Sequence, residues 1–388
     1  MTVDRQWAVE ERLIHRLDKL ILSGNTTSAR FIAQELESIY NERIKNLDTQ
    51  GKDPVVLERK AELVQKFGDI QRVMREYDKA LRYYYEALTI APETKSAVKI
   101  RLNIGEVFKE QGKWEESKAT HETGKELARR IGYKEGEADC LRGIGYSYWR
   151  WGELKKALDA YKESFELLKY EPETLLTARI YIELANLHME EQDHEKARPL
   201  YEKALVIVER SGDKTQQIRT NNNIAYLMTK LGKWDEAKKL YDKVIRLSRR
   251  IADAKWEAWG MFNLAECFAK TGEPKKALGL LDNAMKTLER LNDDVGIMRT
   301  HIIYGYAYGA LKDVKNVKGN FETAIHLAER TRMGANAAYY TLEYAHTLEG
   351  LDNRGALVQA KRALDRYAKL GIMRSFDECE KLIERLGG

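Results

Sequence analysis

Histidine is the first side chain in this sequence to test for metal binding or acid-base chemistry. The closest pair is His188 and His194, and Gln192 and Asp193 between them have the composition of a turn. We therefore expect the two rings to lie on different helices. A zinc site needs three or four converging ligands, and no further ligand is indicated beside this pair. We interpret both histidines as packing or surface residues and predict no bound metal.

Cysteine could supply a nucleophile or a thiolate ligand. Cys140, Cys267 and Cys379 are far apart and form no CxxC pair, which predicts neither a disulfide framework nor a zinc site. Cys140 and Cys267 lie near small packing residues, so we expect burial. The sequence also has no phosphate-binding GxxxxGK[ST] loop, no GxGxxG after a strand, no HExxH and no GxSxG. We expect a protein that is not an enzyme and needs no cofactor.

The length and composition of the chain limit the kinds of fold that can position its remaining polar residues. The chain has 388 residues, more than the ~250–300 at which a single core stops growing, so it divides into domains or extends as repeats. Its 33% charged content and 5 prolines favour ordered helix. No apolar run approaches the ~20 residues of a membrane helix, and we expect a cytoplasmic protein without membrane contact. The richness in Lys, Arg and Glu resembles thermophilic proteins and is compatible with an archaeal source.

A small residue that recurs every 40 positions organises the chain. The series is Gly105, Gly145, Ala185, Ala225, Ala265, Gly305 and Ala345, with Gly68 37 positions before it. A second small or short-branched residue follows 12 positions later, and a large ring often follows 16 positions later, as in Tyr84, Tyr161, Tyr201, Tyr241 and Phe321. The intervals of 3, 4 and 7 residues within each unit are helical. Each unit is therefore predicted to be a helical hairpin that stacks on its neighbours.

Turn residues divide each predicted hairpin. Trp114 and Trp234 are predicted to open second helices. We expect Ser117, His121 and Gly124 to weaken the inner face of one hairpin. Glycine ends the first helix where a left-handed residue is required, at Gly112, Gly152, Gly232 and Gly272.

These features carry a specific resemblance. Residues 61–92 resemble the tetratricopeptide repeat at Gly68, Tyr77, Ala80, Tyr84, Ala87, Leu88 and Pro92. The later 40-residue units are similar to the long-helix repeats of kinesin light chains. The resemblance covers residues 57–370 and implies an all-α, right-handed superhelical solenoid of about eight hairpins.

The two ends lie outside the 40-residue register. Residues 1–56 carry two helical stripes, which predict an N-terminal helical hairpin: Trp7, Leu13, Leu17 and Leu20, then Phe31, Leu36, Ile39 and Tyr40. This hairpin is either a degenerate repeat or an effector or oligomerisation element. Residues 371–388 are expected to form a C-terminal capping helix.

The resemblance implies that first helices line a concave groove. Their exposed positions are expected one residue after the small residue, six and three before it, and four or five after it. These offsets also select Asp139, Glu266, Lys270 and Ile302. Exposure of Trp149, Trp259 and Phe262 would favour a binding surface over a merely solvated face. The candidate partner-binding residues are Arg142, Tyr146, Trp149, Arg150, Arg179, Asn186, Arg219, Asn222, Tyr226, Lys230, Trp259, Phe262, Arg299 and Tyr306.

Three functions are compatible with such a groove. The first is a protein-binding adaptor or scaffold that holds an acidic peptide segment of its partner, since the arginines offer forked donors to carboxylates. The second is a ribosome-associated or other ribonucleoprotein factor, for example a homodimer that bridges ribosomal subunits; the net charge of +5 permits RNA contact without indicating it. The third is a peptide-sensing regulator, similar in overall plan to Gram-positive quorum-response proteins, although their N-terminal bundle is larger than the two helices indicated here.

Overall fold

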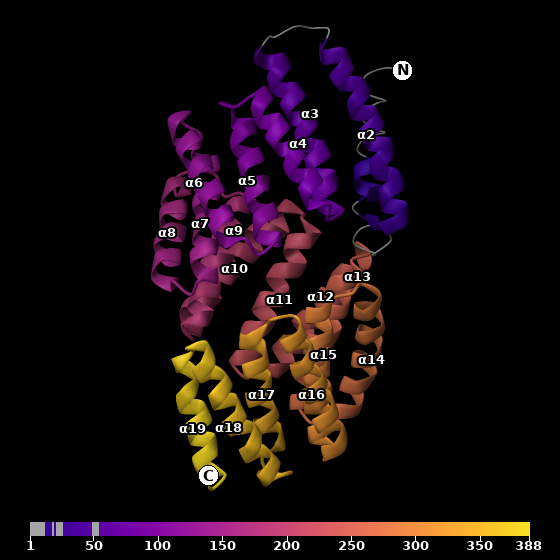
Figure 1. Cartoon of the computed structure of the whole chain (residues 1–388), viewed down its shortest axis with the longest axis vertical. Helices are drawn as coiled ribbons and strands as arrows, with labels where there is room; N and C mark the ends of the chain where they lie inside the picture. The colour runs from indigo at the N-terminus through magenta and orange to yellow at the C-terminus, as the bar shows by residue number, and fades with distance from the viewer. Residues whose placement is uncertain (1–11, 18, 21–25, 49–53) are drawn as a thin grey trace. The chain divides into compact units, whose positions relative to one another are not determined.

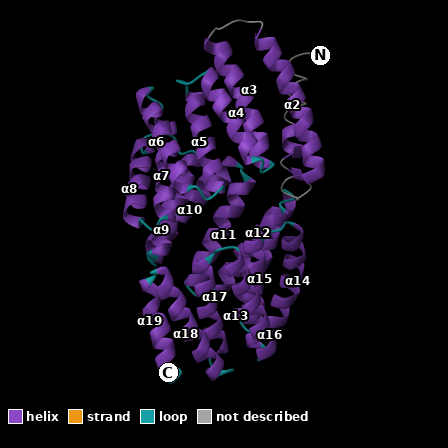
Figure 2. Cartoon of the chain, viewed as in Figure 1, coloured by secondary structure: helices purple, strands orange, loops and turns teal. Residues whose placement is uncertain are grey.

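The computed structural model describes residues 12–17, 19–20, 26–48 and 54–388. All regular secondary structure in these residues is helical, and they contain no strand (Figure 2). The chain divides into two compact units, Met1–Thr220 and Asn221–Gly388. Trp7, which was predicted to belong to the N-terminal hairpin, lies outside the described residues. Among the described helices, none has both the length and the apolar character needed to cross a membrane.

Unit 1 is a stack of helical hairpins (Figure 1). In each hairpin the two helices pack against each other, as α3 does with α4 and α9 with α10. Neighbouring first helices also touch, because α5 contacts both α3 and α7, and α7 contacts α9. The helices are α2 (Thr26–Asp48), α3 (Pro54–Val73), α4 (Tyr77–Ile90), α5 (Lys95–Glu110), α6 (Trp114–Arg130), α7 (Lys134–Arg150), α8 (Leu154–Leu168), α9 (Leu175–Glu190) and α10 (His194–Ser211).

Unit 2 repeats this arrangement. Helix α11 (Lys214–Lys230) contains the boundary between the units. The hairpins α13–α14, α15–α16 and α17–α18 follow, and the first helix α15 contacts both α13 and α17. The helices are α12 (Trp234–Arg250), α13 (Ala254–Lys270), α14 (Pro274–Arg290), α15 (Asp294–Ala310), α16 (Val314–Arg330), α17 (Gly334–Leu348), α18 (Asn353–Leu370) and α19 (Phe376–Arg385), with a short 3-10 turn, η1, at Met373–Ser375.

The predicted 40-residue period is confirmed. First helices begin at Lys95, Lys134, Leu175, Lys214, Ala254, Asp294 and Gly334. Trp114 and Trp234 are the first residues of α6 and α12, as predicted. The predicted turn glycines also adopt left-handed backbone, with φ of 74° at Gly112 and 76° at Gly152. Gln192 and Lys312 occupy the same turn position in other hairpins and share this conformation, each with a φ of 60°.

The recurring small residue is small because a ring fills the space beside it. A Cβ added to Gly145 would lie 2.5 Å from Cε1 of Tyr161, and Gly305 is covered in the same way by Phe321. In the hairpin of α5 and α6, His121 stands where the other repeats have a large aromatic ring, and it lies against Gly105. Ser117, His121 and Gly124 are all buried, and the Ser117 hydroxyl donates to the Gly105 carbonyl oxygen at 2.9 Å. These three residues thus fill the inner face of this hairpin although they depart from the pattern of the other repeats.

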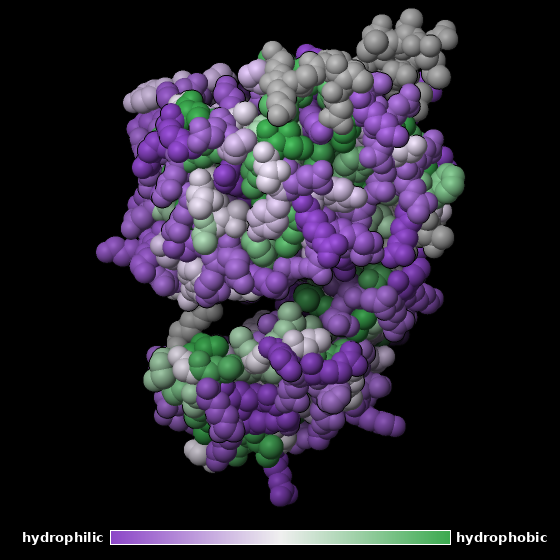
Figure 3. Space-filling model, turned by 45° about the horizontal axis from the view of Figure 1, so that its top comes forward, coloured by the Kyte–Doolittle hydropathy of each residue, from purple (hydrophilic) through white to green (hydrophobic). Residues whose placement is uncertain are grey.

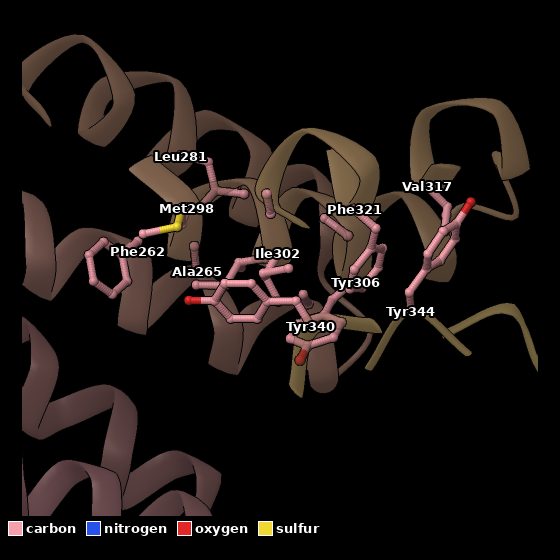
Figure 4. Packing of buried hydrophobic residues seen from close by; sticks show 14 of the residues in the cluster. Phe262, Ala265, Leu281, Met298, Ile302, Tyr306, Val317, Phe321, Tyr340 and Tyr344 are labelled. Carbon is pink, nitrogen blue, oxygen red and sulfur yellow. The ribbon is translucent and has the colours of Figure 1, made fainter. Parts of the chain in front are cut away.

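The interior of unit 2 is a continuous apolar cluster along its hairpins (Figure 4). Phe321 of α16 stacks on Tyr344 of α17 with ring centroids 5.0 Å apart. Phe262 of α13 lies beside Met298 of α15 in this cluster (Figure 4). Stacking of one hairpin on the next therefore removes both helical stripes from water, which an isolated hairpin could not do.

The described helices nearest the two termini are packed in apolar clusters. Leu13, Leu17 and Tyr40 are buried with Phe67 of α3, so the described N-terminal helices extend the core of the repeats. Phe31 is exposed, and its predicted place in the N-terminal apolar stripe is wrong. At the C-terminus, Cys379 and Leu382 of α19 are buried against Tyr367 of α18.

Candidate partner-binding site

Three of the predicted binding residues are buried. Phe262 is only 2% exposed, and Arg142 and Tyr306 are also buried. Phe262 and Ile302 both lie three residues before the recurring small residue and belong to the apolar core of unit 2. In unit 2 these two side chains pack in the core that the stacked hairpins share. The predicted exposure of Phe262 is therefore wrong.

The Arg142 guanidinium is enclosed by carboxylates from three hairpins. Its Nε donates to Asp139 Oδ1 at 2.7 Å. Its Nη2 lies 3.9 Å from Glu106 Oε1 and its Nη1 lies 4.0 Å from Glu183 Oε1. Burial by itself would lower the pKa of Arg142, but these carboxylates raise it above its ordinary value. Arg142 is thus an internal counter-ion, and a partner would have to compete for it.

Aromatic rings surround an exposed arginine at one end of α7. Tyr146 lies 6.1 Å from Trp114 and 5.4 Å from Trp149 between ring centroids. The Arg150 guanidinium lies 4.9 Å from the Trp114 centroid and 5.8 Å from that of Trp149. Such stacking holds the guanidinium in place while its N–H donors stay available at the edge. Trp149 and Tyr146 are partly exposed, and Arg150 is exposed.

Arg179 and Asn186, both on α9, differ in their freedom to bind. Arg179 helps line a shallow pocket with Lys99, Leu102 and Leu175. The Asn186 amide is already used, because its Nδ2 donates to Glu183 Oε2 at 3.3 Å and its Oδ1 accepts from the Tyr201 hydroxyl at 2.6 Å. Arg179 is therefore the better candidate for a direct contact with a partner.

Helix α11 carries four of the predicted residues, Arg219 in unit 1 and the other three in unit 2. Arg219 and Lys230 are exposed, and Tyr226 has 43% of its surface exposed. The Lys230 ammonium lies 5.1 Å from the Tyr226 ring centroid. Asn222 is partly buried, and its Oδ1 accepts from Asn263 Nδ2 at 3.0 Å.

The first-helix surface of unit 2, which we define by residues 221–230 of α11 with α13, α15 and α17, combines rings with paired charges. Arg299 Nη2 lies 3.2 Å from Glu266 Oε2. Burial by itself would lower the pKa of Arg299, but Glu266 and nearby tyrosines raise it. The Tyr306 hydroxyl donates to Glu343, and the Lys270 ammonium lies 3.9 Å from the Tyr306 centroid.

Two further aromatic residues complete the surface of unit 2. Trp259 is partly exposed, and its Nε1 donates to Asp293 Oδ2 at 2.8 Å. Tyr339 was not selected from the sequence, yet 36% of its surface is exposed. It lies six residues before Ala345, so the offset that selected Arg179, Trp259 and Arg299 would have found it.

The positive charge predicted along the groove is therefore interrupted. Arg142 and Arg299 are neutralised by carboxylates of their own unit. Among the described residues, five of the basic side chains selected from the sequence make no ion pair: Arg150, Arg179, Arg219, Lys230 and Lys270.

The residue types that could hold a metal or attack a substrate are dispersed or buried. No group of three or more His, Cys, Asp or Glu side chains is arranged to hold a metal within the described part of the chain. The thiols of Cys140, Cys267 and Cys379 are free and buried, as predicted for Cys140 and Cys267. Burial raises the pKa of Cys267 to about 12 and that of Cys379 to about 11, which keeps both thiols protonated and unreactive near neutral pH.

Comparison with known proteins supports the repeat assignment. One tetratricopeptide-repeat family model matches residues 96–169 and 216–290, and a second matches residues 178–206. No curated sequence matches this chain.

Several solved structures share the fold over nearly the whole chain at low sequence identity. A Rap protein in complex with competence and sporulation factor has 16% identity and a TM-score of 0.64, with 93% of this chain and 99% of that chain covered. The quorum sensor NprR from B. thuringiensis has 15% identity and a TM-score of 0.58, with coverage of 98% and 100%. Aspartyl phosphate phosphatase F from Bacillus subtilis has 14% identity and a TM-score of 0.59, with coverage of 92% and 93%. These likenesses establish the architecture of stacked helical hairpins.

Proposed function

We propose that this chain, whose repeats match tetratricopeptide-repeat models over residues 96–169, 178–206 and 216–290, is a non-catalytic scaffold whose first helices hold a segment of a partner protein. The observation that carries this proposal is the exposure of Tyr226 and Tyr339, at 43% and 36%, on the first-helix surface of unit 2. Tyrosine brings a large apolar face and a polar tip at low entropic cost, and it is enriched where protein interfaces are buried. In unit 1, Trp149 and Arg150 offer the same combination of ring and forked donor.

The basic residues without an ion pair favour acidic side chains in that segment. Lys230 and Lys270 are exposed, and each ammonium rests over a tyrosine ring. A ring face restrains an ammonium without neutralising it, so a partner carboxylate would gain a charge-assisted hydrogen bond. Arg150 is restrained in the same way by two indole rings.

A second candidate is a peptide-sensing regulator. Its support is the match in fold to the quorum sensor NprR over 98% of this chain and all of that one. The described N-terminal helices pack on the first repeat, as a signalling element coupled to the repeats would. The two candidates share the same binding surface and differ in whether the held segment is a free peptide or part of a larger protein.

The proposal is tested by capture from the source cell with and without nuclease. The double variant Tyr226→Ala/Tyr339→Ala is compared with wild type and with a control, the double variant Tyr85→Ala/Tyr170→Ala. The two control tyrosines belong to unit 1, and 49% and 90% of their surfaces are exposed. We expect the partner to be retained by wild type and control after nuclease treatment. The Tyr226/Tyr339 variant should lose it, at a cost of about 2–4 kcal/mol in binding free energy.

Two outcomes would contradict the proposal. A partner held equally by the Tyr226/Tyr339 variant would place binding on another surface. Loss of the partner on nuclease treatment would favour contact through RNA. A photo-crosslinking amino acid at position 226 then identifies the bound segment, and its mass distinguishes a free peptide from part of a larger protein.

A further inference from the structure

We infer that the first helices of unit 1 bind a basic side chain of the partner segment, a lysine or an arginine, beside Glu183. This inference rests on the proposed function and names the chemistry of one contact within it. It opposes the simplest expectation from the sequence, in which arginines make this surface positive throughout. The argument comes from the charge balance around Arg142 and from an unpaired tyrosine hydroxyl.

The charges around Arg142 do not balance. Three carboxylates, Glu106, Asp139 and Glu183, gather around two cations, Lys109 and Arg142. Glu106 is ion-paired with Lys109, and Asp139 accepts the 2.7 Å hydrogen bond from Arg142 Nε. These two pairs consume both cations, and one negative charge is left over on this part of the surface.

Glu183 is the carboxylate with the least compensation. Its closest cation among the described residues is Arg142, with Nη1 and Oε1 4.0 Å apart. Within the same part of the chain, its one short polar contact is the 3.3 Å hydrogen bond from Asn186 Nδ2. Only 17% of its side chain is exposed, so water cannot replace the missing counter-ion fully. A carboxylate in such a setting is costly unless a cation approaches it.

The two neighbouring glutamates respond to this imbalance in opposite directions. Burial raises the pKa of Glu183 above its ordinary value despite the attraction of Arg142. Burial also acts on Glu106, but Lys109 and Arg142 outweigh it and lower the pKa of that carboxyl to about 2. The contrast agrees with the distances, since Lys109 is in direct contact with Glu106 whereas the cation nearest to Glu183 lies 4.0 Å away.

The second observation is the hydroxyl of Tyr161, which has no hydrogen-bond partner among the described residues although the side chain is buried. The ring at the same place in another hairpin is satisfied, because the Tyr84 hydroxyl donates to Asp69 Oδ1 at 2.7 Å. Asp69 directly follows the recurring small residue of its repeat. In the Tyr161 repeat that position is Tyr146, and the Tyr161 hydroxyl makes no hydrogen bond to it.

The unpaired hydroxyl belongs to the same cluster as the uncompensated carboxylate. The charged groups that act most strongly on Tyr161 are Glu183 and Arg142, with Tyr146 beside them. A phenol oxygen accepts a hydrogen bond from an ammonium or guanidinium, and a carboxylate supplies the opposite charge. A single basic group beside Glu183 and Tyr161 would therefore satisfy both.

The first test measures stability without any ligand. If Arg142 were the intended partner of Glu183, Glu183→Gln would lower the melting temperature, as we expect for the matched variant Asp139→Asn. If Glu183 instead awaits a cation from the partner, Glu183→Gln should leave the melting temperature unchanged or raise it, because it removes an uncompensated buried charge. A decrease as large as that of Asp139→Asn would overturn the inference.

The second test selects ligands from a random dodecapeptide display library on the full-length wild-type chain. We expect selected peptides to share a lysine or arginine and to bind Glu183→Gln about 10- to 100-fold more weakly, the range for one charge-assisted hydrogen bond. Replacing the shared lysine or arginine of the peptide by glutamine should weaken its binding to wild type by a similar factor. The same replacement should hardly change its binding to Glu183→Gln. The control Glu195→Gln removes an exposed carboxylate of α10 and should bind as wild type does.

The outcomes separate this inference from the proposed function. Selected peptides that bind wild type and Glu183→Gln equally, or that share no basic residue, would overturn the inference and leave the scaffold function standing. A wild-type chain that selects no peptide would overturn both.

Discussion

The ring of Tyr161 occupies the space that a side chain at position 145 would need, since a Cβ on Gly145 would lie 2.5 Å from Cε1 of that ring. The two residues are 16 positions apart and belong to the two helices of one hairpin. The same relationship joins Gly305 to Phe321. It fixes how closely the helices of a hairpin approach, and hence how the first helices present their binding residues.

Replacement of Gly145 by alanine is therefore expected to destabilise the protein by about 1–3 kcal/mol, because the Tyr161 ring or the helix backbone must shift. The matched control is Gly319→Ala in α16, where an added Cβ meets no atom within 4 Å. That control should stabilise the helix by about 0.5–1 kcal/mol. Denaturant unfolding followed by circular dichroism measures both changes, and equal effects at the two sites would contradict the packing argument.

The left-handed turn at Lys312 predicts a stabilising substitution. Lys312 has a φ of 60°, which costs a residue with a Cβ about 1–2 kcal/mol relative to glycine. We expect Lys312→Gly to raise the unfolding free energy by about 0.5–1 kcal/mol after the entropic cost of glycine. The reverse change, Gly152→Ala at a φ of 76°, should lower it. Opposite signs in the two melting curves are the expected result.

His121 predicts how stability depends on pH. Its ring lies against Gly105 and Gly143, and burial lowers its pKa to about 4 from an ordinary value of 6.5. The unfolded chain therefore binds more protons than the folded one between these values. The contribution of the neutral His121 ring to the free energy of unfolding is fully present above pH 6.5 and is lost as the pH falls toward 4.

The size of this loss is bounded by the pKa difference, which corresponds to about 3 kcal/mol. The comparison is between wild type and His121→Leu, a side chain of similar size that does not titrate. Chemical unfolding at several pH values should show a steeper decline for wild type across this window. Parallel curves for the two proteins would show that the imidazole is not held neutral.

Lys230 and Lys270 predict a salt-dependent contribution to partner binding. Lys230→Gln with Lys270→Gln should weaken binding of an acidic segment by about 1–3 kcal/mol at low ionic strength and by less at high salt. The control Lys239→Gln with Lys315→Gln removes the same charge from the second helices α12 and α16. Titration calorimetry against the captured partner should show no difference between wild type and this control. If the control variant bound the partner as weakly as the test variant does, the effect would come from net charge alone.

The fold could be predicted from the sequence because its determinants are local and periodic. Gly145 and Tyr161, or Gly305 and Phe321, sit at a fixed interval within one hairpin, so spacing alone reveals their contact. Positive φ at Gly152 follows equally from its place after a first helix.

The binding surface was harder to predict, because exposure and charge depend on contacts between hairpins. Phe262 follows the same offset as Asn222, yet one packs into the core and the other is only partly buried. The sequence alone predicts Arg142 to be a free cation. In the folded chain it lies near Glu106 and Glu183, which belong to the two neighbouring first helices. Such pairings across repeats are set by helix packing and leave no signal within any one repeat.

The order of packing along the chain also has a consequence for synthesis. Within each unit, the principal contacts of the described hairpins join helices that are consecutive or next but one in sequence, as α7 contacts α8 and α9. Chains with such low contact order lose little loop entropy at each step and fold quickly. A hairpin can thus dock on its predecessor soon after it leaves the ribosome, and apolar surface exposed on the nascent chain is covered one repeat at a time.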